Sequence, residues 1–214
     1  MKKPDLSSIR KEYLEKKLDE SDIPNDPFVL FTNWFYEVLN GGVNEPSAMF
    51  LATASKEGTP SGRIVLLKGF DHKGFVFYTN YFSSKGVEME ENPVVAATFF
   101  WKEVERQVRI TGTVIKTSIR ESDEYFRSRP FDSRISATIS PQSGVIQNRQ
   151  FLEERRNKLI ESVDPENLQR PENWGGYRIK PTTFEFWQGR EYRLHDRIRY
   201  RKVKNHWVLE RLAP

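Results

Sequence analysis

The sequence predicts a mainly β fold with flanking helices, an α+β arrangement in which antiparallel strands form a closed or split barrel. Short segments rich in β-forming residues follow one another between residues 48 and 117, and turn sequences such as KEGTPSG and DHKG separate them. The regular alternation of strands and helices that builds a parallel sheet is missing. Short strands with tight connections therefore favour a barrel of antiparallel strands.

The composition narrows the class of protein. The chain has 214 residues, which predicts one domain, and its lack of cysteine excludes disulfide bonds, thiolate metal sites and a cysteine nucleophile. A net charge of +4 favours anionic partners only mildly and is small for a nucleic-acid-binding protein. No apolar run approaches the ~20 residues of a membrane span, and the N-terminus does not resemble a signal peptide. We therefore expect a cytoplasmic protein.

The first part of the chain is predicted to be helical. Ile9, Tyr13 and Leu18 lie near helical spacing, which indicates a helix at the N-terminus. The segment FVLFTNWFYEVLN (28–40) carries a wide apolar stripe, and Gly41 is a plausible end for this second helix.

The strands are predicted from β-forming composition and alternation. In chain order they are AMFLATAS (48–55), GRIVLLKGF (62–70), GFVFYTN (74–80), VVAATFFW (94–101), ERQVRITGTVIKT (105–117), TTFEFWQG (182–189), YRLHDRIRYRKV (192–203) and HWVLERL (206–212). If GREYRLHDRIRYR (189–201) is a strand, Glu191, Arg193, His195 and Arg197 lie on one face, because side chains alternate with a period of two residues. Such a face is either simply solvated or binds something anionic. DPENLQRPENWGGY (164–177) is expected to be a loop.

Residues 118–163 are expected to form a helical insert whose first helix is ended by Pro130, since a proline disfavours helical backbone at the residue before it. Tyr125 and Arg129 are four residues apart and share a helix face, and Ser133 follows past the proline. A phenol, a guanidinium and a hydroxyl could converge there on an anion. The alternative is an ordinary helix end at the surface.

Two other stretches also indicate anion binding. A short helix is expected over SSKGVEMEEN (83–92), where free backbone N–H groups, two hydroxyls and Lys85 could seat a phosphate; ordinary capping of the helix is the alternative. Arg63 and Lys68 flank an apolar strand, on opposite faces if the strand alternates strictly. Either a bulge realigns them or they serve different subsites, or both are charged strand ends in solvent.

The remaining motifs exclude some chemistries and leave others open. The three histidines are not spaced as metal ligands, so no metal site is expected, and the absence of GxSxG gives hydrolase chemistry no support. Gln142 and Ser143 lie in a predicted loop that could donate hydrogen bonds or be a simple turn. Trp187 could pack in the core or cover a flat ring. Two anion sites with aromatic surface suit a phosphorylated flat cofactor and a phosphorylated small substrate.

Several of these motifs, in this order along nearly the whole chain, resemble the pyridoxamine 5′-phosphate oxidase family. They are RIVLLKGFDHKGFVFYTN, ERQVRITG, YFRSRPFDSRISATISPQSG, NWGGYRI and EFWQG…RLHDR…RLAP. The resemblance implies an FMN-binding split β-barrel that works as a homodimer with FMN at the subunit interface. It also implies an N-terminal lid segment (1–20) followed by a single domain (21–214) that contains the helical insert of about 118–163.

The resemblance further implies a reaction. Pyridoxamine or pyridoxine 5′-phosphate would give a hydride from C4′ to flavin N5, and dioxygen would reoxidise the flavin to yield hydrogen peroxide. The product would be pyridoxal 5′-phosphate, with ammonia released from the amine. The lack of a cysteine, a metal cluster or a serine triad is consistent with this chemistry, because the cofactor performs the redox step.

Roles for individual residues are carried over from the family. Those that match FMN contacts, some of them across the dimer, are Arg63, Ile64, Val65, Leu66, Lys68, Tyr78, Thr79, Lys85, Gln107, Gln142, Ser143, Trp187 and Arg197. Those that match the grip on the substrate phosphate are Lys68, Tyr125, Arg129 and Ser133, and Arg10 and Tyr13 match a segment that closes over the substrate. The implied catalytic residues are Arg193 and His195, which face the pyridine ring, and Arg197, which faces the flavin.

One position among the FMN contacts departs from the family. The family often has serine–arginine–lysine where this chain has Ser83, Ser84 and Lys85. At Ser84 a hydroxyl replaces a guanidinium that would fork onto the FMN phosphate. A charge-assisted hydrogen bond contributes roughly 1.5–3 kcal/mol, so we expect weaker FMN binding unless another cation compensates.

Three other functions compete with this interpretation. A related FMN-barrel oxidase, such as one resembling the phenazine-pathway enzymes, would keep FMN and change the substrate, but Tyr125, Arg129 and Ser133 favour a phosphorylated substrate. A non-catalytic carrier of flavin or pyridoxal phosphate is disfavoured by Arg193 and His195. A nucleic-acid-binding protein is disfavoured by the small net charge and the interleaved acidic residues.

Overall fold

The computed structural model describes residues 17–19, 21 and 23–214. Most of the expected N-terminal helix and lid segment, with Arg10 and Tyr13, lies outside the described residues. Within the described part of the chain, no helix combines the length and the apolar content that crossing a membrane requires.

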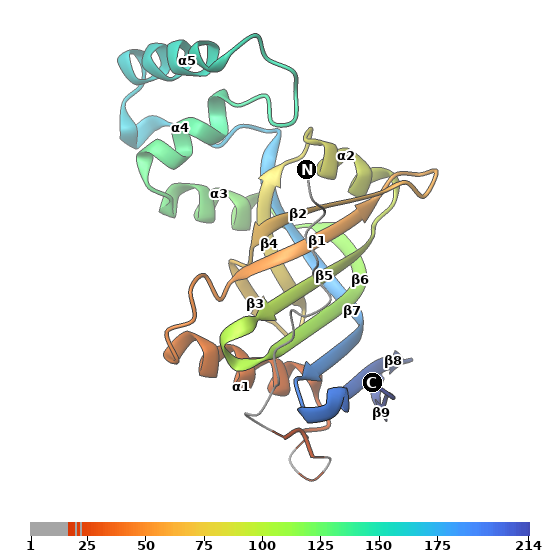
Figure 1. Cartoon of the computed structure of the whole chain (residues 1–214). Helices are drawn as coiled ribbons and strands as arrows, with labels where there is room; N and C mark the ends of the chain where they lie inside the picture. The colour runs from red at the N-terminus through yellow and green to blue at the C-terminus, as the bar shows by residue number, and fades with distance from the viewer. Residues whose placement is uncertain (1–16, 20, 22) are drawn as a thin grey trace, which may run out of the picture. The chain divides into compact units, whose positions relative to one another are not determined.

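The described residues form a β-sheet together with α-helices (Figure 1). Along the chain, one helix precedes the first strand, a second follows the fourth strand, and three more follow the sixth strand. The strands are β1 (Ala48–Ala54), β2 (Pro60–Leu66), β3 (Gly69–Asp71), β4 (Gly74–Asn80), β5 (Val94–Trp101), β6 (Arg106–Lys116), β7 (Trp174–Gln188), β8 (Asp196–Val203) and β9 (His206–Arg211). The α-helices are α1 (Pro27–Asn40), α2 (Ser84–Glu91), α3 (Ile119–Ser128), α4 (Phe131–Ile139) and α5 (Arg149–Ser162). The predictions for α1, α2, β1, β4, β5, β6 and β9 are confirmed to within a few residues.

The strand order is β2-β1-β5-β6-β7-β4-β3, and β8 pairs with β7 and β9. The pairs β1–β2, β3–β4, β4–β7, β7–β8 and β8–β9 are antiparallel, as expected. The chain divides into two compact units. The terminal unit contains the described residues up to 46 with residues 98–110 and 182–214, and the central unit contains residues 47–97 and 111–181. The strands β5, β6 and β7 each run through both units.

The terminal unit has an aromatic core built on α1. Asp26 caps this helix by accepting a hydrogen bond from the Phe28 backbone N–H at 2.9 Å, and Gly41 follows its last residue, as predicted. The apolar stripe of α1 packs on strand residues: the rings of Phe31 and Phe99 lie 5.2 Å apart, and those of Trp34 and Phe186 also lie 5.2 Å apart. Such edge-on aromatic contacts bury large apolar areas, which anchors the helix on the sheet.

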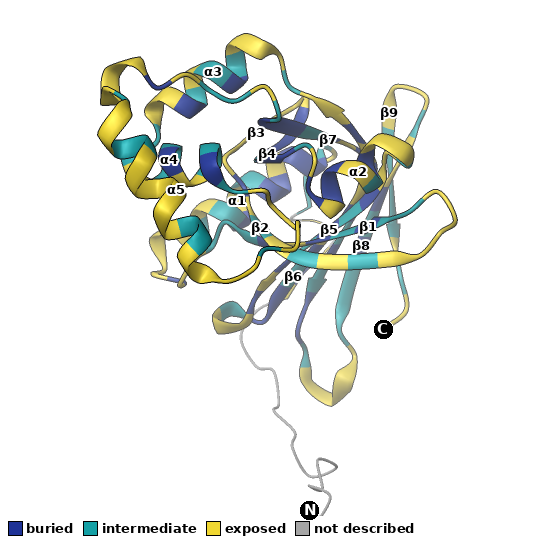
Figure 2. Cartoon of the chain, turned by 90° about the horizontal axis from the view of Figure 1, so that it is seen from above, coloured by how far each residue is buried: buried dark blue, intermediate teal, exposed yellow. Residues whose placement is uncertain are grey.

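The central unit carries the helical insert. The helices α3, α4 and α5 follow one another, with α4 between the other two (Figure 1), and α5 has no fully buried residue (Figure 2). Pro130 separates α3 from α4, as predicted, because Arg129 has the extended backbone that a following proline favours. The helical insert is therefore bent, and is not one straight helix, at the residues that were predicted from the sequence to bind an anion.

The segment 62–70, predicted as one strand, is two strands separated by Leu67 and Lys68. The Leu67 backbone N–H donates to Ser47 O, and the Lys68 N–H donates to Val76 O, each at 2.8 Å. The chain thus changes its pairing partner between these residues, from the β1 side to the β4 side. The alternation argument for Arg63 and Lys68 does not apply across such a corner.

The start of β7 was predicted wrongly as loop. Gly175 and Gly176 lie inside the strand, opposite Thr79 and Tyr78 of β4. A Cβ at Gly175 would lie 2.0 Å from the Tyr81 hydroxyl oxygen, and one at Gly176 would lie 2.4 Å from a side-chain oxygen of Thr117. These glycines allow neighbouring groups to approach the strand closely, which is a common reason for glycine within a strand.

The strand predicted over 192–203 begins only at Asp196. Glu191–Arg193 forms a short 3₁₀ turn, in which Tyr192 and Arg193 have positive φ angles of 55° and 63°. Left-handed backbone cannot continue a strand. The prediction that Arg193, His195 and Arg197 share one strand face is therefore wrong, since only Arg197 of the three lies in β8.

The tight turn between β3 and β4 gives a test of the fold. Gly74 has a φ of +132°, and a Cβ there would lie 1.9 Å from Ile179 O. We expect Gly74→Ala to lower the free energy of unfolding by at least ~2 kcal/mol, because both the backbone conformation and the space exclude a side chain. The measurement is denaturant unfolding of the purified protein.

The matched control is Gly69→Ala, at the first residue of β3. An added Cβ meets nothing within 4 Å at Gly69, so this variant should stay within ~0.5 kcal/mol of the parent. Equal losses of stability in the two variants would contradict the described geometry of the hairpin.

Candidate functional site

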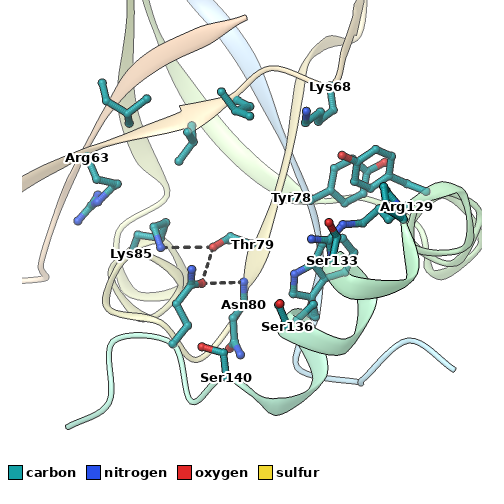
Figure 3. Close-up of a pocket in the computed structure, with 18 residues that line it drawn as sticks. Arg63, Lys68, Tyr78, Thr79, Asn80, Lys85, Arg129, Ser133, Ser136 and Ser140 are labelled. Carbon is teal, nitrogen blue, oxygen red and sulfur yellow. Dashed lines mark hydrogen bonds between the residues drawn. The ribbon is translucent and has the colours of Figure 1, made fainter. Parts of the chain in front are cut away.

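The central unit contains a cavity of about 760 Å³, a size typical of small-molecule sites. Residues predicted from the sequence that line it are Arg63, Ile64, Val65, Leu66, Lys68, Tyr78, Thr79, Lys85, Tyr125, Arg129, Ser133 and Gln142. They come from β2, the corner after β2, β4 and α2, and from the helical insert. In Figure 3, Arg63, Thr79 and Lys85 lie on one side of the cavity, and Tyr78, Arg129 and Ser133 lie on the other.

Lys85 is a buried cation at the start of α2. Its Nζ donates to Thr79 Oγ1 at 3.3 Å and to Ser83 Oγ at 3.2 Å, and Thr79 in turn donates to Gln142 Oε1 at 3.0 Å. Burial lowers the pKa of Lys85, and the charge of Arg63 lowers it further. Ser83 caps the helix by accepting from the Gly86 N–H, as one of the two sequence alternatives predicted. Capping and anion binding are compatible here, because the lysine and the helix N-terminus both favour negative charge.

Arg63 is held on the same side by polar side chains. Its guanidinium donates to Thr53 Oγ1, to Ser61 Oγ at 2.5 Å and to the Glu88 carboxylate at 3.3 Å. Burial raises the pKa of Glu88, but hydrogen bonds from Ser61 and Thr53 and the charge of Arg63 outweigh it and leave that pKa below its usual range. Glu88 is therefore ionised at neutral pH and restrains Arg63.

Arg129 stands at the opposite side with unused hydrogen-bonding capacity. It is the residue directly after α3, so Tyr125 within the helix and Ser133 within α4 border the same space across the bend. Its Nη1 is buried and has no hydrogen-bond partner among the described residues. Burial lowers the pKa of Arg129, but a guanidinium stays charged at neutral pH. A half-buried cation with a buried free donor that borders a cavity is suited to an anionic ligand.

Neutral aromatic side chains line the side of the cavity that holds Arg129. The rings of Tyr78 and Tyr125 stack with centroids 3.8 Å apart. Burial and the charge of Glu121 raise the pKa of Tyr78 to about 12, and burial raises that of Tyr125. Both hydroxyls therefore stay protonated at neutral pH and can donate hydrogen bonds.

Lys68 also lines this cavity together with Arg63. The corner at Leu67–Lys68 explains how two residues predicted to lie on opposite faces reach one space. Ser84 and Ser143 border a neighbouring cavity of about 640 Å³, and Gln142 borders both. Ser84 is exposed at the first position of α2. The FMN contacts assigned to Ser84 and Ser143 stay predictions.

The other predicted residues belong to the terminal unit, namely Gln107, Trp187, Arg193, His195 and Arg197. Arg197 donates to the Glu185 carboxylate at 2.9 Å and to Ala213 O at 2.8 Å. His195 Nδ1 accepts from the Arg190 N–H at 3.2 Å, so the neutral ring carries its proton on Nε2. Burial, followed by the charge of Arg193, lowers the pKa of His195, which favours that neutral form.

Some cavity residues were missed by the sequence reasoning, namely Asn80, Pro130, Ser136, Ala137, Ser140 and Trp174. Ser136, Ala137 and Ser140 lie at helical spacing after Ser133, so the period of α4 could have revealed them. Trp174 gave no such signal, because its segment was predicted as loop.

The sequence matches two family models. Residues 36–159 match the model described as pyridoxamine 5′-phosphate oxidase, and residues 174–214 match that of the pyridoxine 5′-phosphate oxidase C-terminal dimerisation region. Among solved structures, PhzG from Burkholderia lata in complex with tetrahydrophenazine-1-carboxylic acid has a TM-score of 0.87 at 30% identity, covering 94% of this chain and 99% of that one. An FMN-binding protein from Nostoc punctiforme, related to pyridoxamine 5′-phosphate oxidase, has a TM-score of 0.71 at 17% identity, covering 88% and 98%.

Curated relatives are similar over nearly the full length. A pyridoxine/pyridoxamine 5′-phosphate oxidase from Polynucleobacter asymbioticus is 52% identical over 98% of this chain and 99% of its own. The oxidase of the same name from Haemophilus influenzae is 49% identical over 98% of this chain and 100% of its own. The predicted mainly β split-barrel fold is confirmed by these likenesses, and the chain belongs to the pyridoxamine 5′-phosphate oxidase family.

Proposed function

We propose that this protein is an FMN-dependent oxidase that converts pyridoxamine 5′-phosphate or pyridoxine 5′-phosphate to pyridoxal 5′-phosphate. The observation that carries the proposal is a single cavity with cations on two sides, Lys85 and Arg63 on one and Arg129 on the other. Two phosphate groups, one on a cofactor and one on a substrate, need such an arrangement. The names of the curated relatives support this choice of substrate.

The residues of the first side fit an FMN phosphate. Lys85 supplies a buried ammonium at a helix N-terminus, and Arg63 adds a restrained guanidinium. Backbone groups of residues 63–66, with Thr79 and Gln142, would hold the rest of the cofactor. Bound FMN supplies the two-electron redox chemistry that amino-acid side chains lack.

On the second side, Arg129, Ser133, Tyr125 and Lys68 would bind the substrate phosphate. Arg193 and His195 would orient the pyridine ring with C4′ toward the cofactor, since positioning supplies much of the rate of such transfers. Overall, pyridoxamine 5′-phosphate, dioxygen and water give pyridoxal 5′-phosphate, ammonia and hydrogen peroxide. From pyridoxine 5′-phosphate and dioxygen, the products are pyridoxal 5′-phosphate and hydrogen peroxide.

The proposed working form is a homodimer with FMN at the subunit interface. The match of residues 174–214 to a dimerisation region supports this state. Gln107, Trp187 and Arg197 are proposed FMN contacts, some of them made across the interface. Arg197 would stabilise the negative charge that reduction places on the flavin.

A related oxidase of another aromatic substrate is the second candidate, because PhzG is 30% identical. Its structure holds a carboxylic acid without a phosphate. The free donor of Arg129 beside Ser133 favours the phosphorylated substrate for this chain.

The direct test is a spectroscopic titration. The purified protein should be yellow, or become yellow with FMN, and should bleach when pyridoxine 5′-phosphate is added without oxygen. Admitting oxygen should restore the colour and produce hydrogen peroxide. A yellow protein that does not bleach would favour the carrier or the related oxidase, and a protein that cannot take up FMN would overturn the proposal.

Ser84 provides a test of the cofactor phosphate site. We expect Ser84→Arg to tighten FMN binding by about tenfold to a hundredfold, because a charge-assisted bond to phosphate contributes roughly 1.5–3 kcal/mol. Riboflavin, which has no phosphate, is the control ligand and should bind both proteins equally. Unchanged FMN affinity would contradict the expectation that the serine at this position weakens FMN binding.

Arg193 provides a test of the catalytic assignment. We expect Arg193→Met to lower kcat/KM by about a hundredfold or more while the unfolding midpoint stays unchanged, because the side chain is exposed and its proposed role is orientation. Arg201→Met is the control, since Arg201 is an exposed arginine paired with Glu210 and has no assigned role. Wild-type turnover in Arg193→Met would remove Arg193 from the mechanism.

A further inference from the structure

Trp174 borders the cavity beside Arg129, and the family resemblance assigned it no role. It is the first residue of β7, it is 6% exposed, and it lines the cavity at the side that holds Arg129 and Ser133. The Arg129 Cζ lies 4.6 Å from the centroid of the indole ring. This distance is well within the range of a cation–π contact, and tryptophan is the aromatic residue that binds cations best.

The indole also belongs to a nearly parallel aromatic stack. Its ring lies 5.5 Å from that of Tyr78 with an interplanar angle of 13°, and 6.2 Å from that of Tyr125 with an angle of 6°. The stack thus joins the two tyrosines of the cavity wall to the ring that faces Arg129.

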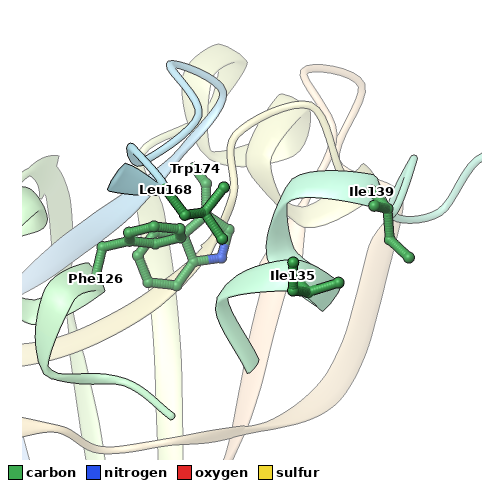
Figure 4. Packing of buried hydrophobic residues seen from close by; sticks show 5 residues of the cluster. All are labelled: Phe126, Ile135, Ile139, Leu168 and Trp174. Carbon is green, nitrogen blue, oxygen red and sulfur yellow. The ribbon is translucent and has the colours of Figure 1, made fainter. Parts of the chain in front are cut away.

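Trp174 is itself firmly held. It packs in a buried cluster with Phe126, Ile135, Ile139 and Leu168 (Figure 4), and the Phe126 ring meets it edge-on at 5.4 Å. Its carbonyl accepts from Arg170 Nη1 at 2.5 Å, and Arg170 is paired with Asp123 at 2.6 Å. A ring fixed on so many sides gives the guanidinium above it a defined position.

The contrast with Arg63 explains why a ring is used. Arg63 is restrained by Thr53, Ser61 and Glu88, which occupy its N–H groups and place a carboxylate beside it. The guanidinium of Arg129 makes no hydrogen bond or ion pair with another described residue. An aromatic face restrains a cation without using its donors or neutralising its charge, so both remain for a ligand.

We infer that Trp174 is a positioning residue for phosphate recognition: its indole holds Arg129 so that the free guanidinium N–H groups face the phosphate of the substrate. The inference rests on the proposed function, because it assumes that Arg129 binds that phosphate. It adds a residue that acts on the substrate phosphate through Arg129.

The test compares Trp174→Leu with Phe126→Leu in the FMN-loaded enzyme. Phe126 is fully buried in the same cluster and its ring touches the indole. Its hydrogen bond with Arg129 joins backbone atoms only, from the Arg129 N–H to Phe126 O, and a change of side chain keeps those atoms, so Phe126→Leu controls for lost packing. We expect Trp174→Leu to raise the KM for pyridoxine 5′-phosphate and the Kd for pyridoxal 5′-phosphate by about tenfold, with a much smaller change in kcat. Pyridoxal, which lacks the phosphate, should bind both variants as it binds the wild type.

A conservative variant and a double mutant separate an effect on phosphate binding from a loss of stability. Trp174→Phe keeps a ring with a weaker attraction for cations, and we expect it to raise the Kd for pyridoxal 5′-phosphate by about threefold. In an Arg129→Met background, the same change should have no further effect, because the indole would have no cation to hold.

Two results would overturn the inference. One is that Trp174→Leu and Phe126→Leu lower the thermal stability by the same amount and leave the affinity for pyridoxal 5′-phosphate unchanged. The other is that the effects of Trp174→Phe and Arg129→Met simply add. Failure of the proposed function is distinguished by the wild type, which would then not oxidise pyridoxine 5′-phosphate at all.

Discussion

The pairing of β4 with the beginning of β7 is the constraint on which the candidate site depends. In this register Tyr78 lies opposite Gly176, Thr79 opposite Gly175 and Asn80 opposite Trp174. A strand without side chains at two consecutive positions leaves room for the groups that pack against it, which a Cβ would displace. The same register sets Trp174 beside the tyrosines, so one pairing builds both the wall of the cavity and the support of its arginine.

The cations that line the cavity are held by different kinds of neighbouring group, and these neighbours determine how much positive charge is left for a ligand. Among the described residues, Arg63 forms an ion pair with Glu88, whereas Lys85 donates to the hydroxyls of Thr79 and Ser83 and is also within the influence of the Glu88 charge. Arg129 has an aromatic ring. A carboxylate beside a phosphate site lowers the local positive potential, whereas hydroxyls and rings leave it intact. The local charge therefore favours anions most strongly at Arg129, whose guanidinium has no carboxylate partner among the described residues.

Local features of the sequence predicted most of the elements, and tertiary contacts explain the failures. The strands β4 and β5 were predictable because their composition and turns are local signals. Gly175 was assigned to a loop because its reason for being glycine, the nearby Tyr81 hydroxyl, is remote in sequence. Twelve of the cavity residues could be named from family motifs. Trp174 also lies in one of these motifs, NWGGYRI, but the motif gave it no role, since that role depends on the side chain of Arg129.

Arg197 is a cation that contacts within the terminal unit hold in a fixed position. It donates to Glu185 and to Ala213 O, and Glu185 also accepts from Arg109 at 3.2 Å. One carboxylate is thus shared by two guanidiniums, so the group as a whole keeps a net positive charge. A cation fixed by such contacts needs little reorganisation when negative charge develops near it, which is the condition for effective electrostatic stabilisation. The fixed position of Arg197, more than its charge alone, makes it suitable for the role proposed beside the reduced flavin.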